Sequence, residues 1–195
     1  YNPARAKALL DMFGYVDKDG DGWRDMPDGS PLVLEYATSP SAADRELNEV
    51  WKKSMTAVGI QVVFKTAKWP ENLKAARAGK VMMWGLGNSA SSPDGGSFLD
   101  FGYGPQKFEG NLAAFQNDEY DKLYRQQVVM PDGPDRLAIM QKMVKILVTY
   151  MPYKFNTHRI RTDVMQPWLI GYRRHPTSRA FWRYVDIDLS KLPKP

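Results

Sequence analysis

Residues 60–84 read IQVVFKTAKWPENLKAARAGKVMMW and contain two apolar stretches separated by a more polar segment. Residues 60–66 and 81–84 are short and rich in apolar side chains, which predicts two strands, the second of them buried. Pro70 and Gly79 lie at either end of the intervening segment, where proline commonly opens and glycine commonly closes a helix. The stretch is therefore predicted to form a β-α-β unit.

The residues before this unit extend the same alternation. Residues 32–38 are predicted to be a strand, and residues 41–58 a helix, because apolar side chains recur there at helical spacing until Gly59. Asn2, Pro3 and Gly14 delimit another helix at the start of the chain. This order predicts an α/β fold with a largely parallel sheet flanked by helices and joined by right-handed crossovers.

The residues after the unit are richer in helix. Residues 117–129 and 134–150 are predicted to be amphipathic helices whose apolar faces pack on the open face of the sheet. Residues 152–160 are expected to return as a further strand. The tail, residues 162–195, is interrupted by prolines and glycine, and within it residues 181–185 are predicted to be a strand.

A long loop follows the strand at residues 81–84. Residues 84–98, WGLGNSASSPDGGSF, begin with an indole, continue with amide and hydroxyl groups, and contain glycines that let a backbone approach a guest closely. Long loops inside compact domains are usually functional or disordered, and this combination of groups suits a small-molecule pocket. The alternative is a flexible connection with Trp84 in the hydrophobic core.

Composition limits the function classes. The chain of 195 residues is 43% hydrophobic and 25% charged with a net charge of +5, which is typical of a folded globular domain. Because it contains no cysteine, disulfides and thiolate chemistry are excluded. Arg159, Arg161, Arg173 and Arg174 lie among aromatic residues, an arrangement that suits either nucleic-acid binding or a solvated strand face. No recognised nucleic-acid-binding module accompanies them, so we expect no nucleic-acid partner.

One acidic segment resembles half of a metal site. Asp17, Asp19, Asp21 and Gly22 match the first positions of an EF-hand calcium loop. The twelfth position is Asp28 rather than glutamate, and the prolines that flank it prevent the exiting helix. We favour a plain turn built by aspartate side chains, with calcium binding as the open alternative, and predict no metal site.

Catalytic signatures are weak. His158 and His175 have no metal-ligand spacing, and Ser89, Ser91 and Ser92 are not part of a Gly-x-Ser-x-Gly elbow. The Gly-Leu-Gly segment at residues 85–87 is only a fragment of a dinucleotide-binding fingerprint. We therefore predict no catalytic residues and no cofactor. A small α/β hydrolase or transferase remains an alternative that would require a catalytic pair to converge in space.

Several short motifs occur in a familiar order. They are YNPARAKALL at residues 1–10, DGDGWR at 19–24, GSPL at 29–32, the helix and strand around residues 51–62, Trp84 with Pro93-Asp94, NDEYDKL at 117–123, PDR at 134–136, Met151-Pro152 and PWLIGY at 167–172. Together they resemble the C-terminal lobe of bacterial family 5 extracytoplasmic solute-binding proteins of the peptide/nickel type. The resemblance covers roughly nine tenths of the chain and depends on the order of the motifs rather than on any single one.

The resemblance implies a binding protein rather than an enzyme. Residues 1–195 would be one α/β lobe of a two-lobe clamp that closes on a peptide or other small solute and delivers it to an ABC importer permease. The N-terminal lobe is expected to be absent from this sequence, and residues 176–195 to pair with it. We expect a monomer in the periplasm or otherwise outside the cytoplasm, secreted or lipid-anchored.

The same resemblance suggests where the solute lies. Trp84 takes the place of a cleft-lining aromatic residue. The other candidate ligand-binding residues follow it along the same wall, and they are Leu86, Asn88, Ser89, Asp94 and Phe98. Peptide-binding relatives pair the ligand ammonium with an aspartate shortly after the strand, where this chain has Gly87 and Asn88. A peptide could be bound through Asp94, and an uncharged, anionic or metal-chelate solute fits equally well.

Overall fold

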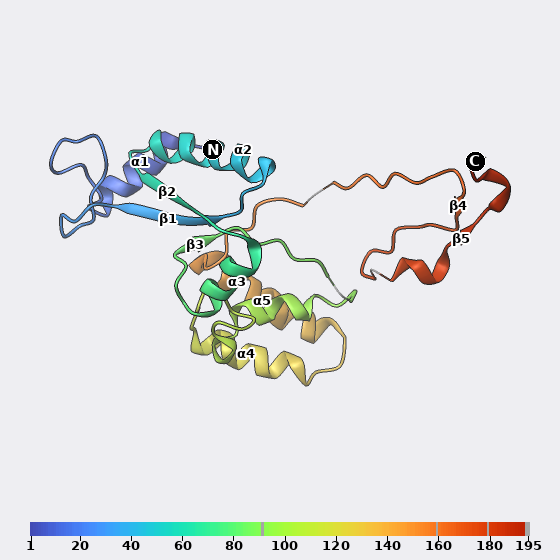
Figure 1. The fold of residues 1–195 in the computed structure, drawn as a ribbon. Coiled ribbons are helices and arrows are strands. Elements are labelled where there is room, and N and C mark those ends of the chain that lie inside the picture. The colour runs from blue at the N-terminus through green and yellow to red at the C-terminus, as the bar shows by residue number, and fades with distance from the viewer. Residues whose placement is uncertain (91, 159, 179, 194–195) are drawn as a thin grey trace. The chain divides into compact units, whose positions relative to one another are not determined.

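The computed structural model describes residues 1–90, 92–158, 160–178 and 180–193, and the chain divides into two compact units, Tyr1–Gly87 and Asn88–Pro195. The first unit contains a three-stranded parallel sheet with its helices, and the second contains α- and 3₁₀ helices, a two-stranded sheet and long irregular segments (Figure 1). Ser91 and Arg159, which entered the sequence predictions, lie outside the described residues. Within the part of the chain that the structure describes, no helix is long and apolar enough to cross a membrane.

The first unit has the predicted β-α-β-α-β order. Its elements are α1 (Pro3–Met12), β1 (Val33–Thr38), α2 (Ala42–Thr56), β2 (Gln61–Thr66), α3 (Trp69–Arg77) and β3 (Met83–Trp84). The strands lie in the order β2-β1-β3, and both pairs are parallel, with Thr38 opposite Thr66 and Ala37 opposite Trp84. The predicted parallel sheet flanked by helices is thus confirmed.

The order of the strands determines the positions of the helices. The chain moves from β1 to β2 in one direction and then crosses to β3 on the other side of β1. Right-handed crossovers in opposite directions place their helices on opposite faces of a sheet. Accordingly α2 packs against β2, and α3 lies on the other side of the sheet (Figure 1).

Side-chain caps begin the helices where the sequence predicts. The Asn2 carboxamide oxygen accepts a hydrogen bond of 2.9 Å from the Arg5 backbone N–H, and the Ser41 hydroxyl accepts one of 3.0 Å from Asp44. In the second unit the Asn117 carboxamide oxygen accepts one from the backbone N–H of Tyr120 at 2.8 Å. Each cap satisfies a backbone donor that has no partner inside its helix.

The last strand of the sheet is shorter and more exposed than predicted. Only Met83 and Trp84 pair with β1, both are half-buried, and Met82 is 61% exposed. The prediction of a buried strand over residues 81–84 is therefore wrong in extent and in burial. The greater exposure follows from the position of β3 at the edge of the sheet, where no strand covers its outer side.

The second unit contains two consecutive helices that pack on each other, α4 (Asp118–Val128) and α5 (Pro134–Tyr150), joined by a short turn. Its other elements are the 3₁₀ helices η1 (Gly95–Gly102), η2 (Gly104–Gln106), η3 (Phe181–Tyr184) and η4 (Leu189–Lys191), and the two-residue strands β4 (Leu169–Ile170) and β5 (Asp186–Ile187), which pair antiparallel. Residues 95–98, predicted as loop, therefore begin a 3₁₀ helix.

The core of the second unit lies among α4, α5 and η1. Its buried members are Leu99, Tyr120, Ile139, Met143 and Leu147. The apolar faces of α4 and α5 pack on each other and on η1, so these helices find their partner within their own unit and do not need the sheet, contrary to the expectation from the sequence.

Two predicted strands of the second unit are not formed. Residues 152–158 have no strand, and Ile160 is 99% exposed. Residues 181–184 form a 3₁₀ turn, and the strand comes only at Asp186–Ile187. Apolar and aromatic content predicted both strands, but a strand also needs a neighbour with which to exchange backbone hydrogen bonds.

Candidate functional site

The carboxyl edge of the sheet is where the first unit gathers its candidate site. Strand β1 ends at Thr38 and β3 ends at Trp84, next to each other in the sheet. The chain crosses from β1 to β2 on one side and then to β3 on the other, so the strand order reverses at β1. In open α/β sheets, ligands bind outside the carboxyl ends of the strands at such a reversal.

A buried polar network holds this edge together. The Asn72 side-chain amide donates hydrogen bonds to the backbone carbonyls of Thr38, at 2.9 Å, and Ala67, at 3.2 Å. The Asn48 amide donates to the Thr38 hydroxyl at 3.0 Å. Because Thr38 and Asn72 are 5% and 4% exposed, these bonds tie the end of β1 to the start of α3 in a water-poor environment.

Two indoles lie at the same edge of the sheet. Trp69 is the first residue of α3, and its ring centroid lies 6.5 Å from that of Trp84, with the ring planes tilted by 49°. Trp84 is half-buried and Trp69 is 53% exposed. The pair therefore presents aromatic surface to solvent at the sheet edge, and Trp84 is not enclosed in a hydrophobic core.

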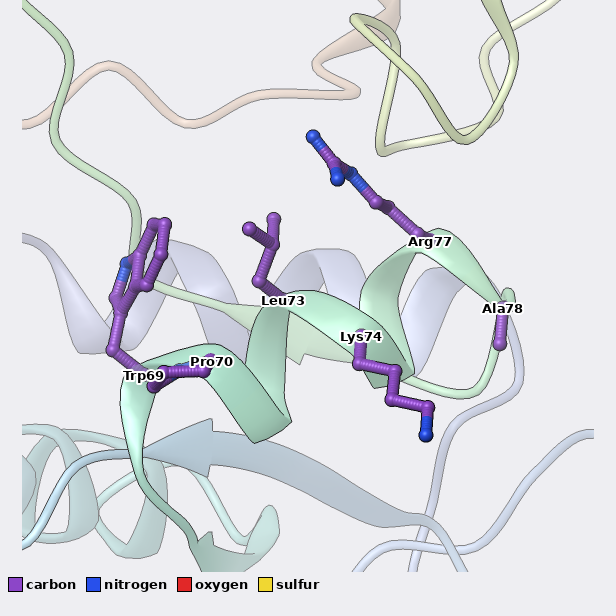
Figure 2. Close-up of a pocket in the computed structure, with 6 residues that line it drawn as sticks. All are labelled: Trp69, Pro70, Leu73, Lys74, Arg77 and Ala78. Atoms are coloured by element: carbon purple, nitrogen blue, oxygen red, sulfur yellow. The ribbon is translucent and has the colours of Figure 1, made fainter.

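A hollow of about 390 Å³ lies along α3 beside this pair. It is lined by Trp69, Pro70, Leu73, Lys74, Arg77 and Ala78 (Figure 2). The indole of Trp69 and the side chains of Leu73 and Arg77 rise on the same side of the helix, whereas the Lys74 ammonium points away (Figure 2). The hollow thus has an aromatic end, an aliphatic middle and a cationic end.

The backbone after Trp84 runs close to the sheet. A Cβ atom on Gly85 would lie 2.4 Å from the Tyr36 hydroxyl oxygen, so glycine permits this approach. Burial raises the pKa of Tyr36, and the hydroxyl therefore stays protonated. Leu86 follows with 46% of its surface exposed. The side chains predicted to line a site from this unit, Trp84 and Leu86, are both accessible to a guest.

The remaining predicted site residues belong to the second unit. Asn88 and Ser89 are exposed, and the Asn88 carboxamide oxygen accepts a hydrogen bond of 2.8 Å from the Ser89 backbone N–H. Phe98 lies in η1 with its ring centroid 6.0 Å from that of Phe101, which in turn packs against Tyr153. Phe98 is therefore a member of an aromatic cluster of its own unit.

Asp94 is engaged by an arginine. Its two carboxylate oxygens each accept a hydrogen bond of 3.0 Å from the Arg136 guanidinium, in a bidentate pair. Arg136 also donates to both oxygens of Gln127, the backbone carbonyl and the side-chain amide, and to Asp132. The hydrogen bonds from Arg136 hold the pKa of the Asp94 carboxyl below its usual value. Asp94 thus already has a cationic partner inside its own unit.

The acidic segment near the start of the chain is a network of turns. The Asp17 carboxylate accepts hydrogen bonds from the backbone N–H groups of Gly20 and Gly22, and the Asp21 carboxylate accepts one from Trp23. These are the plain aspartate turns that the sequence favoured. Oxygens of Asp17, Asp19 and Asp21 come within 4.8 Å of one another, all on exposed side chains.

Two of the groups that suggested other functions have structural partners. Nδ1 of His175 accepts hydrogen bonds from the backbone N–H groups of Thr177 and Ser178, so this histidine caps a turn. Arg174 forms an ion pair with Asp163, whose carboxylate also accepts a hydrogen bond from the Tyr172 hydroxyl at 2.8 Å. The charge of Arg174 is thereby balanced by an acidic residue of its own unit.

Four residues of the hollow along α3 and of the Asp94 ion pair were not predicted from the sequence. Trp69, Leu73 and Arg77 recur every fourth residue, a spacing that places them on one face of a helix and could have identified the stripe. Nothing local relates Arg136 to Asp94, because the two are 42 residues apart.

Comparison with known proteins places this architecture in a family. The profile of bacterial extracellular solute-binding proteins, family 5 (middle region), matches residues 1–110. Di/tripeptide-binding protein 2 of Pseudomonas aeruginosa is 26% identical over 194 residues, which cover 96% of this chain and 34% of that protein. Heme-binding protein A of Haemophilus influenzae is 23% identical over 190 residues, covering 96% of this chain and 33% of that protein.

A solved structure shares the fold. The oligopeptide-binding protein AppA of Bacillus subtilis, in complex with a nonapeptide, superposes with a TM-score of 0.75 and 23% identity, covering 91% of this chain and 35% of AppA. The chain spans about a third of the length of the curated relatives it matches. Because the family profile covers more than half of the sequence, the chain belongs to family 5 of the bacterial extracellular solute-binding proteins.

Proposed function

We propose that residues 1–195 are the C-terminal lobe of a two-lobe protein that captures a small solute outside the cytoplasm and delivers it to the permease of an ABC importer. Family membership supports the solute-binding role. Supporting the two-lobe arrangement, the curated relatives are about three times as long as this chain. The other lobe would supply the opposite wall of the site, and closure of the two would bury the solute.

The solute class that we favour is a short peptide. Two relatives carry di/tripeptide and oligopeptide binding in their names, and AppA was solved with a nonapeptide. Heme-binding protein A, at similar identity, makes a flat aromatic solute the second candidate. Both classes present apolar or aromatic surface, which is what the indoles of Trp69 and Trp84 can cover.

The observation that carries the proposal is this pair of accessible indoles at the carboxyl edge of the parallel sheet. Aromatic side chains bury large areas with little loss of conformational entropy, so they are effective walls for a guest that enters and leaves. We propose that Trp84, Leu86, Asn88 and Ser89 contact the solute. Asp94 and Phe98 would instead shape the following loop, since Arg136 and Phe101 already occupy them.

The C-terminal tail supports a partner within the same polypeptide. Trp182, Tyr184 and Leu189 are 71%, 73% and 75% exposed, more apolar surface than a short segment normally leaves in water. We propose that residues 176–195 pack against the other lobe. The assembled protein would act as a monomer, without cofactor or chemistry of its own.

Thermal unfolding of the intact two-lobe protein tests the proposal. A single defined tripeptide, Phe-Ala-Ala, at 100 times its dissociation constant stabilises the native state by about 2.7 kcal/mol and so raises Tm. We expect Trp84→Ala to remove most of this shift and Trp84→Phe to retain part of it, because the smaller ring still covers apolar surface.

Leu47→Ala is the matched control. Leu47 lies on α2 with 58% of its surface exposed and is distant in sequence from the indole pair, so its loss should leave the ligand-induced shift intact. An undiminished shift in Trp84→Ala, with the unliganded variant folded by circular dichroism, contradicts the proposed site.

A further inference from the structure

The segment that carries Asn88 and Ser89, two of the proposed solute contacts, is anchored by a long-range ion pair. We call residues 88–94 the site loop. Where the structure describes it, the site loop contains no helix or strand, and the Asn88 carboxamide oxygen accepts a hydrogen bond only from the adjacent Ser89. At the end of the loop, the Asp94 carboxylate accepts two hydrogen bonds of 3.0 Å from the Arg136 guanidinium. This pair joins the loop to the helices of the second unit.

Arg136 lies in the first turn of α5 and is held by groups other than Asp94. Its guanidinium donates a hydrogen bond of 3.1 Å to the backbone carbonyl of Gln127 and one of 3.0 Å to the side-chain oxygen of the same residue. Gln127 lies in the last turn of α4 with 1% of its surface exposed, and the Arg136 side chain is 12% exposed. The α4–α5 pair therefore fixes the guanidinium, and the guanidinium in turn fixes Asp94.

A buried glycine provides the space for this ion pair. A Cβ atom on Gly96 would lie 2.8 Å from a carboxylate oxygen of Asp94 and 2.9 Å from Nη2 of Arg136. The adjacent Gly95 has no such restriction, since its Cβ atom would lie 3.6 Å from the terminal methyl carbon of Met140, an ordinary contact. A side chain at position 96 would therefore force the pair apart without changing any charge.

We propose that Arg136 is a positioning residue of the solute site, which orders the site loop before the solute arrives and so raises the affinity that Asn88 and Ser89 provide. This inference rests on the proposed solute-binding function and adds to it a residue that does not touch the solute. A binding segment that is ordered in advance loses less conformational freedom on binding. When only about a third to a tenth of the molecules hold the loop in the binding conformation, the apparent Kd rises about three- to tenfold.

Isothermal titration calorimetry of Phe-Ala-Ala with the full-length protein tests this role through two carboxylates. Asp94 and Asp132 both form ion pairs with Arg136, but Asp132 lies in the turn between α4 and α5 with its side chain 88% exposed. We expect Asp94→Asn to raise Kd about three- to tenfold. Asp132→Asn should leave Kd within about twofold of the wild-type value, because the exposed pair contributes little and lies outside the site loop.

Variants of Arg136 and of the two glycines sharpen the test. Arg136→Gln should weaken binding as Asp94→Asn does, and Arg136→Lys should weaken it less, because lysine keeps the charge but loses the bidentate fork. Gly96→Ala should also raise Kd, whereas Gly95→Ala should not. Combining Gly96→Ala with Asp94→Asn should add little to either change alone, since both break the same pair.

The outcomes separate the positioning role from the proposed function. An unchanged Kd in Asp94→Asn, or an equal rise of Kd in Asp132→Asn, overturns the role of Arg136 and leaves the proposed function standing. A lower Tm of unliganded Asp94→Asn with an unchanged Kd shows that the pair stabilises the fold alone, which also overturns that role. Failure of the wild-type protein to bind Phe-Ala-Ala contradicts the peptide-binding function itself, and the positioning role falls with it.

Discussion

The two units of the chain differ in what they bury. In the second unit, large apolar side chains are sealed from water, with Tyr120 and Met143 both at 0% exposure. In the first unit the buried apolar residues are the small ones Ala37, Val58 and Ala76. The larger aromatic residues of the first unit, among them Trp69 and Trp84, stay partly exposed.

Each unit is therefore stabilised by different interactions within itself. The first unit depends on backbone pairing in its sheet and on buried polar groups such as Asn72 and Asp25, whose carboxylate accepts a hydrogen bond of 2.8 Å from the Lys18 backbone N–H. The second depends on tight apolar packing. A unit stabilised in the first way can leave its indoles open for a guest without losing its fold.

The largest expected effect is a cavity in the second unit. Met143→Ala removes a fully buried side chain and should lower the free energy of unfolding by about 2–5 kcal/mol. The neighbouring Val144 is 46% exposed, and Val144→Ala should cost less than about 1 kcal/mol. Urea unfolding measures both, and similar losses in the two variants would show that the core is not sealed at Met143.

Two glycine substitutions compare the tolerance of the units directly. A Cβ atom on Gly102 would lie 2.5 Å from the Tyr120 ring and 2.7 Å from Leu147, both in the buried core. Gly102→Ala should therefore cost about 1–3 kcal/mol through overpacking. Gly85→Ala meets only the end of the half-buried Tyr36 side chain, which can shift, so we expect a smaller loss. The same urea titration decides this, and a larger loss for Gly85→Ala reverses the ranking.

The smallest expected effect is on the stability of the protein at acidic pH. The pKa of Asp94 is lower in the folded protein than in the unfolded chain, so its contribution to stability is present above the unfolded pKa of about 4. That contribution is lost as the pH falls through the folded pKa. Between pH 6 and pH 3, Asp94→Asn should therefore lose less stability than the wild-type protein.

Hydrogen exchange of residues 92–98 at pH 6 locates this effect. The exposed Asp94 carboxylate limits its size, because water screens the ion pair. Faster exchange in Asp94→Asn confined to this segment supports its role in holding the loop. If the stability of Asp94→Asn and of the wild-type protein depends on pH in the same way, the predicted contribution of the Asp94 carboxylate is contradicted.

Local sequence signals predicted the first unit well. Caps at Asn2 and Ser41 and the glycine that follows α2 each act through hydrogen bonds between neighbouring residues, so their effect can be read without the rest of the chain. Alternating strands and helices likewise restrict the sheet to parallel pairing, since a helical crossover returns the chain to the same edge. The family resemblance drew on the same local motifs.

Only the tertiary structure decided which of the predicted ligand-binding side chains remain available to a ligand. Asp94 is neutralised by an arginine 42 residues away, and Phe98 packs against Phe101 and so into an aromatic cluster that includes Tyr153. Residues 152–158 have strand-like composition but no neighbouring strand. Pairing of charges, rings and strands depends on which distant segments meet, and composition carries no information about that meeting. The sequence by itself determined the helices and the sheet of the first unit. The partners of candidate site residues such as Asp94 and Phe98 depend on packing between segments distant in sequence, and only the tertiary structure decided them.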